Sequence, residues 1–135
     1  MRSIIPTILF TVPLSLALKT STVQAREDNT KAAFFTTRVK PILDANCARC
    51  HGGTNHRGGL NMDTRESLLK GGRDGASVAP GDPTSSLLIK LIRHEGPKDD
   101  PKNMPPKGEK LSDADIKIVE DWVKAGAAMP VAPVK

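Results

Sequence analysis

Large aromatic side chains are almost absent from this sequence. Its 135 residues include no tyrosine, one tryptophan and three phenylalanines. A chain of this length forms one small domain, and aromatic residues normally supply much of the bulk of a small core. Eleven glycines and eleven prolines contribute loops rather than packing. We therefore expect a bound apolar group, such as a flat macrocycle, to fill part of the interior.

The sequence also lacks an apolar run long enough to cross a membrane. The longest run, residues 4–18, has 15 residues and is broken by two prolines, whereas a membrane-spanning helix needs about 20. It follows a positive charge at Arg2 and precedes small residues that end at Ala25, which is the pattern of a secretory signal peptide. We predict a signal peptide over residues 1–25 and a protein that is periplasmic or otherwise exported. We expect no stable membrane anchor after the signal is cleaved.

The charge is mildly basic and excludes little by itself. The formal net charge is +5, and it falls to +3 when Arg2 and Lys19 leave with the predicted signal. No cluster of lysine and arginine alternates with aromatic residues, and no nucleic-acid-binding motif is present. We therefore expect no nucleic-acid partner.

The apolar pattern predicts a small all-α domain with long loops and no internal repeat. Apolar residues recur at helical spacing in five segments that glycines and prolines separate, namely residues 34–40, 41–51, 64–70, 83–95 and 111–127. The last is the clearest, because Ser112 and Asp115 form a capping-box-like pair at its start. We expect residues 26–33 to be a flexible lead-in, residues 34–128 to be the domain, and residues 129–135 to be a C-terminal tail.

Both cysteines of the chain lie in one short motif, Cys47-Ala-Arg-Cys50-His51. On a helix these three side chains project from nearly one face. The C-x-x-C-H spacing is the signature of covalent haem attachment, in which both sulfurs form thioethers and the imidazole binds the iron. A zinc site that uses His56 as a fourth ligand and a thiol–disulfide couple are the alternatives. The first normally pairs two separated knuckles and the second belongs to a βαβ context, so the residues favour haem.

A haem iron held by His51 has a second axial position to fill. Met104 stands in a polar, proline-rich loop over residues 97–110, where no helix or strand supports a packing role. Two prolines follow it and stiffen the backbone. Thioether ligation suits electron transfer, and the residues therefore favour Met104. The alternatives are Met62, Met129, His56 and His94.

Four stretches in a fixed order resemble planctomycete-type cytochrome c domains, which are class I-like c-type cytochromes. They are VKPILDANCARCHGG, RGGLNMDTRESLLKGG, SVAPGDPTSSLLIKLI and NMPPKGEKLSDADIKIVEDWVKAGA. The resemblance covers about residues 34–128 and implies a helical domain with long loops wrapped around one covalent haem c. It implies that Cys47 and Cys50 carry the haem, and that His51 and Met104 are its axial iron ligands. Members of this family are often fused to larger domains, so a domain directly behind a signal favours a soluble carrier or a subunit.

These expectations combine into a function. We predict a periplasmic mono-haem c-type cytochrome that transfers one electron, meets redox protein partners and is not an enzyme. The alternative is a haem-based sensor or small-ligand-binding module in which Met104 is labile. A di-haem peroxidase would need a second C-x-x-C-H motif. The expected apolar walls of the haem site are Phe34, Leu43, Leu60, Leu87, Leu91 and Trp122, and the cations expected near a haem carboxylate are Arg73, Lys90 or Arg93.

Overall fold

The fold is all-α over the residues that the computed structural model describes, which are 14–95, 102–107 and 109–131. Within these ranges the only extended pairing is an isolated bridge between Gly72 and Gly75. The predicted all-α class is therefore confirmed. Residues 1–13 of the predicted signal, residues 96–101 and 108 of the proline-rich loop, and residues 132–135 of the tail lie outside the described residues.

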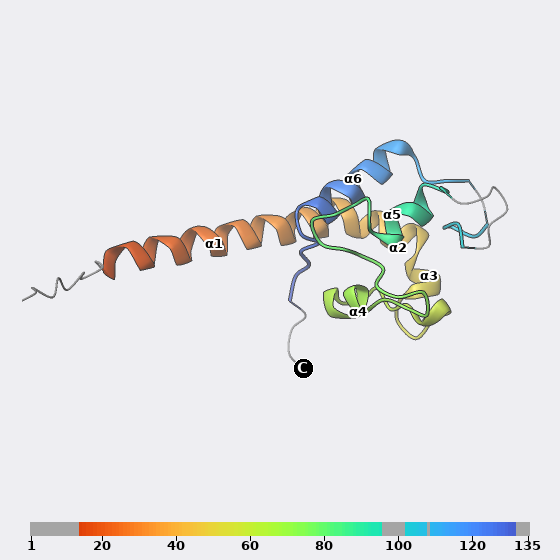
Figure 1. Ribbon diagram of the computed structural model, residues 1–135, viewed down its shortest axis with the longest axis horizontal. Helices are drawn as coiled ribbons and strands as arrows, with labels where there is room; N and C mark the ends of the chain where they lie inside the picture. Colours follow the sequence, from red (N-terminus) through yellow and green to blue (C-terminus); the bar gives the residue numbers. More distant parts are fainter. Residues whose placement is uncertain (1–13, 96–101, 108, 132–135) are drawn as a thin grey trace, which may run out of the picture.

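A long first helix, α1 (Leu14–Phe34), extends away from the body that the other helices form (Figure 1). It includes residues 26–33, whose side chains are mostly exposed and which we predicted to be a flexible lead-in. This segment is helical in the structure, while its mobility and the predicted domain boundaries stay predictions. Among the described residues, no helix is both long and apolar enough to cross a membrane.

The chain passes from α1 into the body through a π-helical turn, η1 (Phe35–Val39), and continues as α2 (Lys40–Asn46). We predicted a fresh helix starting at Pro41. Proline lacks an N–H and its ring clashes with the carbonyl four residues back in a regular α-helix. The wider π turn removes that conflict, because the N–H just before the proline bonds the carbonyl five residues earlier, at Phe35. The helix therefore bulges at this point and does not restart.

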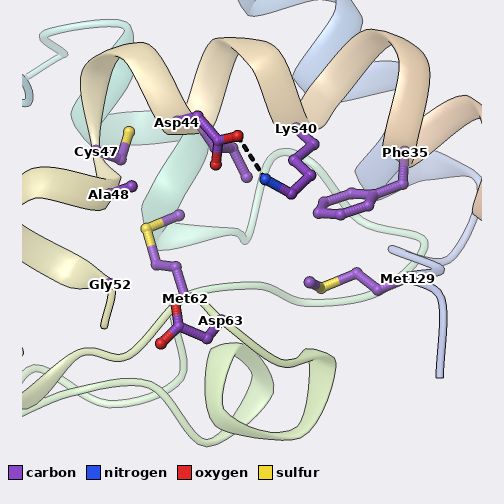
Figure 2. A pocket seen from close by; sticks show the side chains of 10 residues that line it. Phe35, Lys40, Asp44, Cys47, Ala48, Gly52, Met62, Asp63 and Met129 are labelled. Atoms are coloured by element: carbon purple, nitrogen blue, oxygen red, sulfur yellow. Dashed lines mark hydrogen bonds and ion pairs between the residues drawn. The ribbon is translucent and has the colours of Figure 1, made fainter. Parts of the chain in front are cut away.

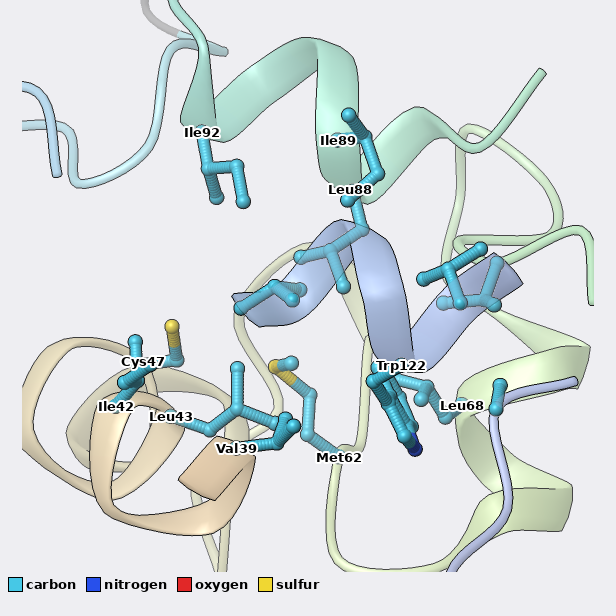
Figure 3. Close-up of a cluster of buried hydrophobic side chains, with 14 of the residues drawn as sticks. Val39, Ile42, Leu43, Cys47, Met62, Leu68, Leu88, Ile89, Ile92 and Trp122 are labelled. Atoms are coloured by element: carbon cyan, nitrogen blue, oxygen red, sulfur yellow. The ribbon is translucent and has the colours of Figure 1, made fainter. Parts of the chain in front are cut away.

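The last helix, α6 (Asp113–Lys124), packs on η1 and on α5 (Leu87–Ile92). Its start is confirmed, because the Ser112 hydroxyl accepts the N–H of Asp115 at 3.0 Å. Trp122 of α6 is 1% exposed, and its ring centroid lies 5.5 Å from that of Phe35. Figure 3 shows Trp122 among aliphatic side chains from several elements. This part of the core closes on protein side chains alone.

The start of α5 differs from the prediction. Aspartate is a favoured N-cap and proline fits the first helical position, so Asp82-Pro83 predicts a helix capped at Asp82. The cap position is instead Ser86. The Asp82 carboxylate instead accepts the N–H groups of Thr84 and Ser85 at 3.0 and 3.1 Å within a turn. Hydrogen bonds from Ser85 and Thr84 lower the pKa of Asp82 to about 2. Because the carboxylate closes a local turn, the helix begins later.

Two loops close against each other beside the short helix α4 (Arg65–Lys70). The residue types allow either Asp63 or Thr64 as the N-cap of α4. The cap is Thr64, whose side chain accepts the N–H of Ser67 at 3.1 Å. The 3₁₀ turn η2 (Arg57–Gly59) lies before α4 and the glycine-rich segment 71–75 follows it. The N–H of Arg73 donates to the carbonyl of Gly58 at 2.8 Å and joins the two loops.

We expect Gly71→Ala to lower the free energy of unfolding by about 3 kcal/mol. Gly71 has a φ of +75°, and a Cβ there would lie 1.9 Å from the carbonyl oxygen of Gly75. The left-handed conformation costs about 1–2 kcal/mol and the overlap about as much again. Gly53→Ala is the matched control, because Gly53 has a φ of +59° with nothing within 4 Å of the added Cβ. Chemical denaturation should give a clearly smaller loss for Gly53→Ala, and equal losses would contradict the predicted overlap.

Candidate functional site

A cavity of about 540 Å³ lies between the segment that holds both cysteines, the η2 loop, the 72–77 loop, α5 and the described part of the proline-rich loop. Most of its wall is apolar. The aliphatic and thioether side chains in the wall, apart from Met104, are Leu60, Met62, Leu87, Leu88, Leu91 and Ile92. The cavity is therefore suited to a large apolar group.

The C-x-x-C-H motif forms one wall of this cavity. We predicted a single helix over residues 41–51, but the helix breaks at Cys47, whose φ and ψ are −124° and −40°, and resumes as α3 (Ala48–His51). The N–H groups of Cys50 and His51 both donate to the Cys47 carbonyl, at 3.0 and 2.9 Å. This tight turn keeps the geometry that the spacing implied, since the two cysteines and the histidine all line the cavity.

The two cysteines are free thiols with different surroundings. Cys47 is 9% exposed and belongs to the hydrophobic core, whereas Cys50 is half-buried. Burial, with a smaller contribution from the neighbouring Cys50, raises the pKa of the Cys47 thiol to about 11. A thiol of this kind stays protonated at neutral pH, unlike the thiolates of redox-active and zinc-binding cysteines. The described residues also contain no group of three or more His, Cys, Asp or Glu side chains placed to hold a metal ion.

In the haem-free protein, iodoacetamide should modify Cys50 at least about tenfold faster than Cys47 at pH 8. With a pKa of about 11, Cys47 is only about one-thousandth thiolate at that pH, and the thiolate is the reacting form. Trypsin cleaves after Arg49 and so separates the two cysteines for mass spectrometry. Labelling in denaturant is the control, where the two rates should converge. Equal rates without denaturant would contradict the burial of Cys47.

The backbone around His51 is fixed on both sides. Its carbonyl accepts the N–H of Met62 at 2.8 Å. A Cβ on the following Gly52 would lie 3.0 Å from both the carbonyl oxygen of Ala48 and a carboxylate oxygen of Asp63. The ring nitrogen Nδ1 of His51 is buried and has no hydrogen-bond partner. Buried polar atoms normally have a hydrogen-bond partner. The described residues provide none for this imidazole nitrogen.

Met104 lies at the same cavity, together with Pro105 and Pro106. Its N–H donates to the carbonyl of Leu91 at 3.0 Å, which ties the loop to α5. The fold therefore brings together a thioether and an imidazole that are far apart in the sequence. The side chain of Met104 is half-buried and packs against the core.

Of the other candidates for a sixth ligand, only Met62 lines this cavity. His56 faces elsewhere, because its Nε2 lies 3.0 Å from the Gly53 carbonyl and 2.9 Å from the side-chain nitrogen of Asn61. His94 places its Nε2 3.1 Å from the carbonyl oxygen of Met104. Met129 lines a different, smaller cavity.

A comparison with protein families bears on this arrangement. Residues 47–108, just under half of the chain, match the family model for planctomycete cytochrome C. The chain contains a planctomycete-type cytochrome c domain. The matched segment begins at Cys47 and includes His51 and Met104. Searches of curated proteins and of solved structures found no match.

Membership of a cytochrome c family implies covalent haem c, and the residues of this cytochrome c domain fit that group. The cavity offers two free thiols for thioether bonds, at Cys47 and Cys50. It also offers the imidazole of His51, which has an unpaired buried nitrogen. It also offers a thioether at Met104 and a mostly aliphatic wall. Two thiols for covalent attachment, with an imidazole and a thioether for the iron, are the groups that hold a His/Met-ligated c-type haem.

The predicted walls are right in part. Leu60, Leu87 and Leu91 line the cavity, whereas Phe34, Leu43 and Trp122 do not. Trp122 is instead a core side chain, and its Nε1 donates to the Ala128 carbonyl at 2.8 Å. Leu88 and Ile92 also line the cavity but were not predicted as wall residues, because the short helix α5 is apolar on nearly every side and its periodicity does not select a face. Met62 was named only as an alternative iron ligand and not as a wall residue.

The cations of the cavity also differ from the expectation. Arg73 lines the cavity but Lys90 and Arg93 do not. Arg93 is paired with Glu95 and Glu120 on the outside, and these two carboxylates raise its pKa. Two further cations that were not predicted, Arg57 and Lys102, are part of the wall. Their positions depend on how the loops close, for which no local sequence signal exists.

A second, smaller cavity of about 130 Å³ lies on the other side of Cys47. Figure 2 shows it between Phe35, Met62 and Met129, with the Lys40–Asp44 ion pair at one side and the Cys47 sulfur turned away. Met129 therefore packs against the core, although we predicted the tail to begin there. Leu43, predicted as a wall of the haem site, lines this second cavity instead.

Proposed function

We propose that this protein is a periplasmic mono-haem c-type cytochrome that transfers single electrons through a haem iron held by His51 and Met104. The observation that carries the proposal is the shared cavity, whose wall contains both thiols, the imidazole and the thioether. The family match supports the c-type cytochrome assignment. One C-x-x-C-H motif in the chain supports a single haem.

Each residue would have a distinct part. Cys47 and Cys50 would hold the haem through thioether bonds, and His51 and Met104 would hold its iron. A bound haem c supplies an iron that gains and loses one electron. Backbone hydrogen bonds, from Met62 to His51 and from Met104 to Leu91, hold the two residues that would bind the iron. Fixed ligands and an aliphatic wall keep water out and limit structural change during electron transfer.

Arg57 and Arg73 are candidates to neutralise the haem carboxylates. Both line the cavity, both are exposed, and neither side chain has an ion-pair or hydrogen-bond partner among the described residues. The third cation of the wall, Lys102, is already paired with Asp74 at 3.3 Å. The hydrogen bond between Arg73 and Gly58 holds the two arginine-bearing loops together.

The partner of this cytochrome would be another redox protein, reached after export behind the predicted signal peptide. The predicted mature charge of +3, less two haem carboxylates, leaves about +1, so long-range electrostatic steering should be modest. Recognition would then depend on local contacts near the cavity. No nucleic-acid partner is proposed.

The visible spectrum of the purified, reduced protein with and without carbon monoxide tests this function. An electron carrier with both axial positions filled by protein should show the same spectrum in both conditions. A marked shift on adding carbon monoxide would favour the alternative, a sensor or ligand-binding module in which Met104 leaves the iron.

A further inference from the structure

His94 holds an unusual position directly beside the methionine loop. It follows α5 with a φ of +53°, a left-handed conformation that residues other than glycine seldom adopt. Its side chain is half-buried, and Nε2 lies 3.1 Å from the carbonyl oxygen of Met104. A carbonyl oxygen can only accept, so Nε2 carries the proton and donates. The unfavourable backbone conformation is therefore associated with a specific contact.

The backbone N–H of Met104 is hydrogen-bonded as well as its carbonyl. The N–H of Met104 donates to the carbonyl of Leu91, in the last turn of α5, at 3.0 Å. Both hydrogen-bonding groups of the Met104 backbone thus bond to the C-terminal end of one helix. These two hydrogen bonds, one at the N–H and one at the carbonyl of Met104, restrict the rotation of its backbone more than a single bond would. They therefore fix the position from which its side chain extends.

The helix that provides these anchors is itself firmly held. Ile89 and Ile92 of α5 are 1% and 2% exposed, and α5 packs against α6. Between these residues and His94, Arg93 donates from Nε to the Glu120 carboxylate of α6 at 2.7 Å. A side chain anchored on the end of α5 is therefore anchored on the core of the domain. Figure 3 shows Ile89 and Ile92 on the side of α5 that faces the buried cluster.

We propose that His94 is a positioning residue for the sixth ligand: its imidazole hydrogen bond keeps the Met104 thioether on the iron and excludes outside ligands. This rests on the proposed function, in which Met104 binds the iron. The role also explains why a histidine near the cavity is absent from its wall. The ring of His94 is occupied with the backbone of the ligand and is not itself a ligand.

The test measures cyanide binding to the ferric holoprotein in three variants. His94→Ala removes the hydrogen bond and should bind cyanide about five- to tenfold more tightly, the factor that corresponds to about 1 kcal/mol of a lost hydrogen bond. His94→Gln keeps an N–H the same number of bonds from Cα and should stay within about twofold of wild type. Alanine and glutamine share the strain of the left-handed backbone, so their difference isolates the hydrogen bond. His56→Ala is the control, because His56 does not line the cavity. Its cyanide affinity should match that of wild type.

Two further readouts separate positioning from general stability. The weak red charge-transfer band of the methionine–iron bond should be diminished in His94→Ala and restored in His94→Gln, and thermal unfolding of the two variants should be similar. Cyanide affinity of His94→Ala equal to wild type, while Met104→Ala binds cyanide tightly, would overturn the inference and leave the proposed function intact. If Met104→Ala binds cyanide no better than wild type, Met104 is not the ligand and both fail. A third outcome is that His94→Ala binds cyanide more tightly than wild type, His94→Gln does not restore the wild-type affinity, and Met104→Ala binds cyanide no better than wild type. His94 would then be the ligand itself, and the inference would be overturned.

Discussion

Replacing Met104 with alanine should leave the haem attached and open the iron to outside ligands. The attachment residues Cys47, Cys50 and His51 lie far from Met104 in the sequence and are unchanged by the substitution. Without the thioether, the reduction potential should fall by on the order of 0.1–0.3 V, a part of the roughly 0.8 V over which axial ligands set haem potentials. The charge-transfer band of the ferric protein should disappear, and the reduced protein should bind carbon monoxide.

Two other methionines serve as controls for this result. Met129→Ala should leave the potential unchanged, because Met129 lines the smaller cavity. Met62 lines both cavities and is buried, so Met62→Leu, which conserves volume, is the suitable change there. A Met104→Ala protein that keeps the wild-type potential and stays closed to carbon monoxide would contradict the assignment. Loss of the band in Met62→Leu instead would assign the ligand to Met62.

Replacing both Cys47 and Cys50 with alanine should reduce the yield of folded protein by more than about tenfold and abolish covalent haem. The expected haem would fill a cavity of about 540 Å³ whose wall is mostly aliphatic. Leaving apolar surface of this kind unpacked is strongly destabilising in a domain with so few aromatic residues. Haem staining of denaturing gels and the yield of soluble protein are the measurements, after expression in cells that attach haem c.

Arg49→Ala is the matched control for the cysteine variant. Arg49 lies between the two cysteines in the sequence, and its side chain is exposed. Its replacement keeps the C-x-x-C-H spacing, so yield and haem staining should be near wild type. A double cysteine variant that accumulates at the wild-type level with ordinary thermal stability would contradict a structural role of the haem in this fold.

The elements that sequence alone predicted well are those defined by local signals. The helices α4 and α6 have their N-caps at Thr64 and Ser112, because a side-chain oxygen there accepts the N–H three residues on. They end where glycines with positive φ follow, at Gly71 and Gly126. Both kinds of signal act within one helical turn, and the sequence therefore contains them in full.

The elements that the sequence predicted poorly depend on contacts between distant segments or on competing local ones. Asp82 has the residue type of an N-cap, yet it closes a turn and α5 begins after Ser86. Trp122 was expected at the haem, but it packs on Phe35, which the continuous helix through η1 brings beside α6. Neither outcome can be read from a window of neighbouring residues.

The candidate site divides in the same way. The spacing of Cys47, Cys50 and His51 predicted a shared face, and these residues do share one cavity even though the helix breaks at Cys47. Met104 was selected from its loop alone, and the structure puts it at that cavity. Its anchors on α5, and the place of Arg57 in the cavity wall, were not predicted, whereas that of Arg73 was. They follow from the way in which three loops close around one space.

The intact mass of the denatured wild-type protein tests the central claim most directly. The claim is that one haem is covalently bound through Cys47 and Cys50. After purification from cells that attach haem c, and after acid–acetone extraction, the polypeptide should keep the added mass of one haem, located on the peptide that contains both cysteines. A polypeptide with the mass of the bare chain, with all haem in the extract, would contradict it.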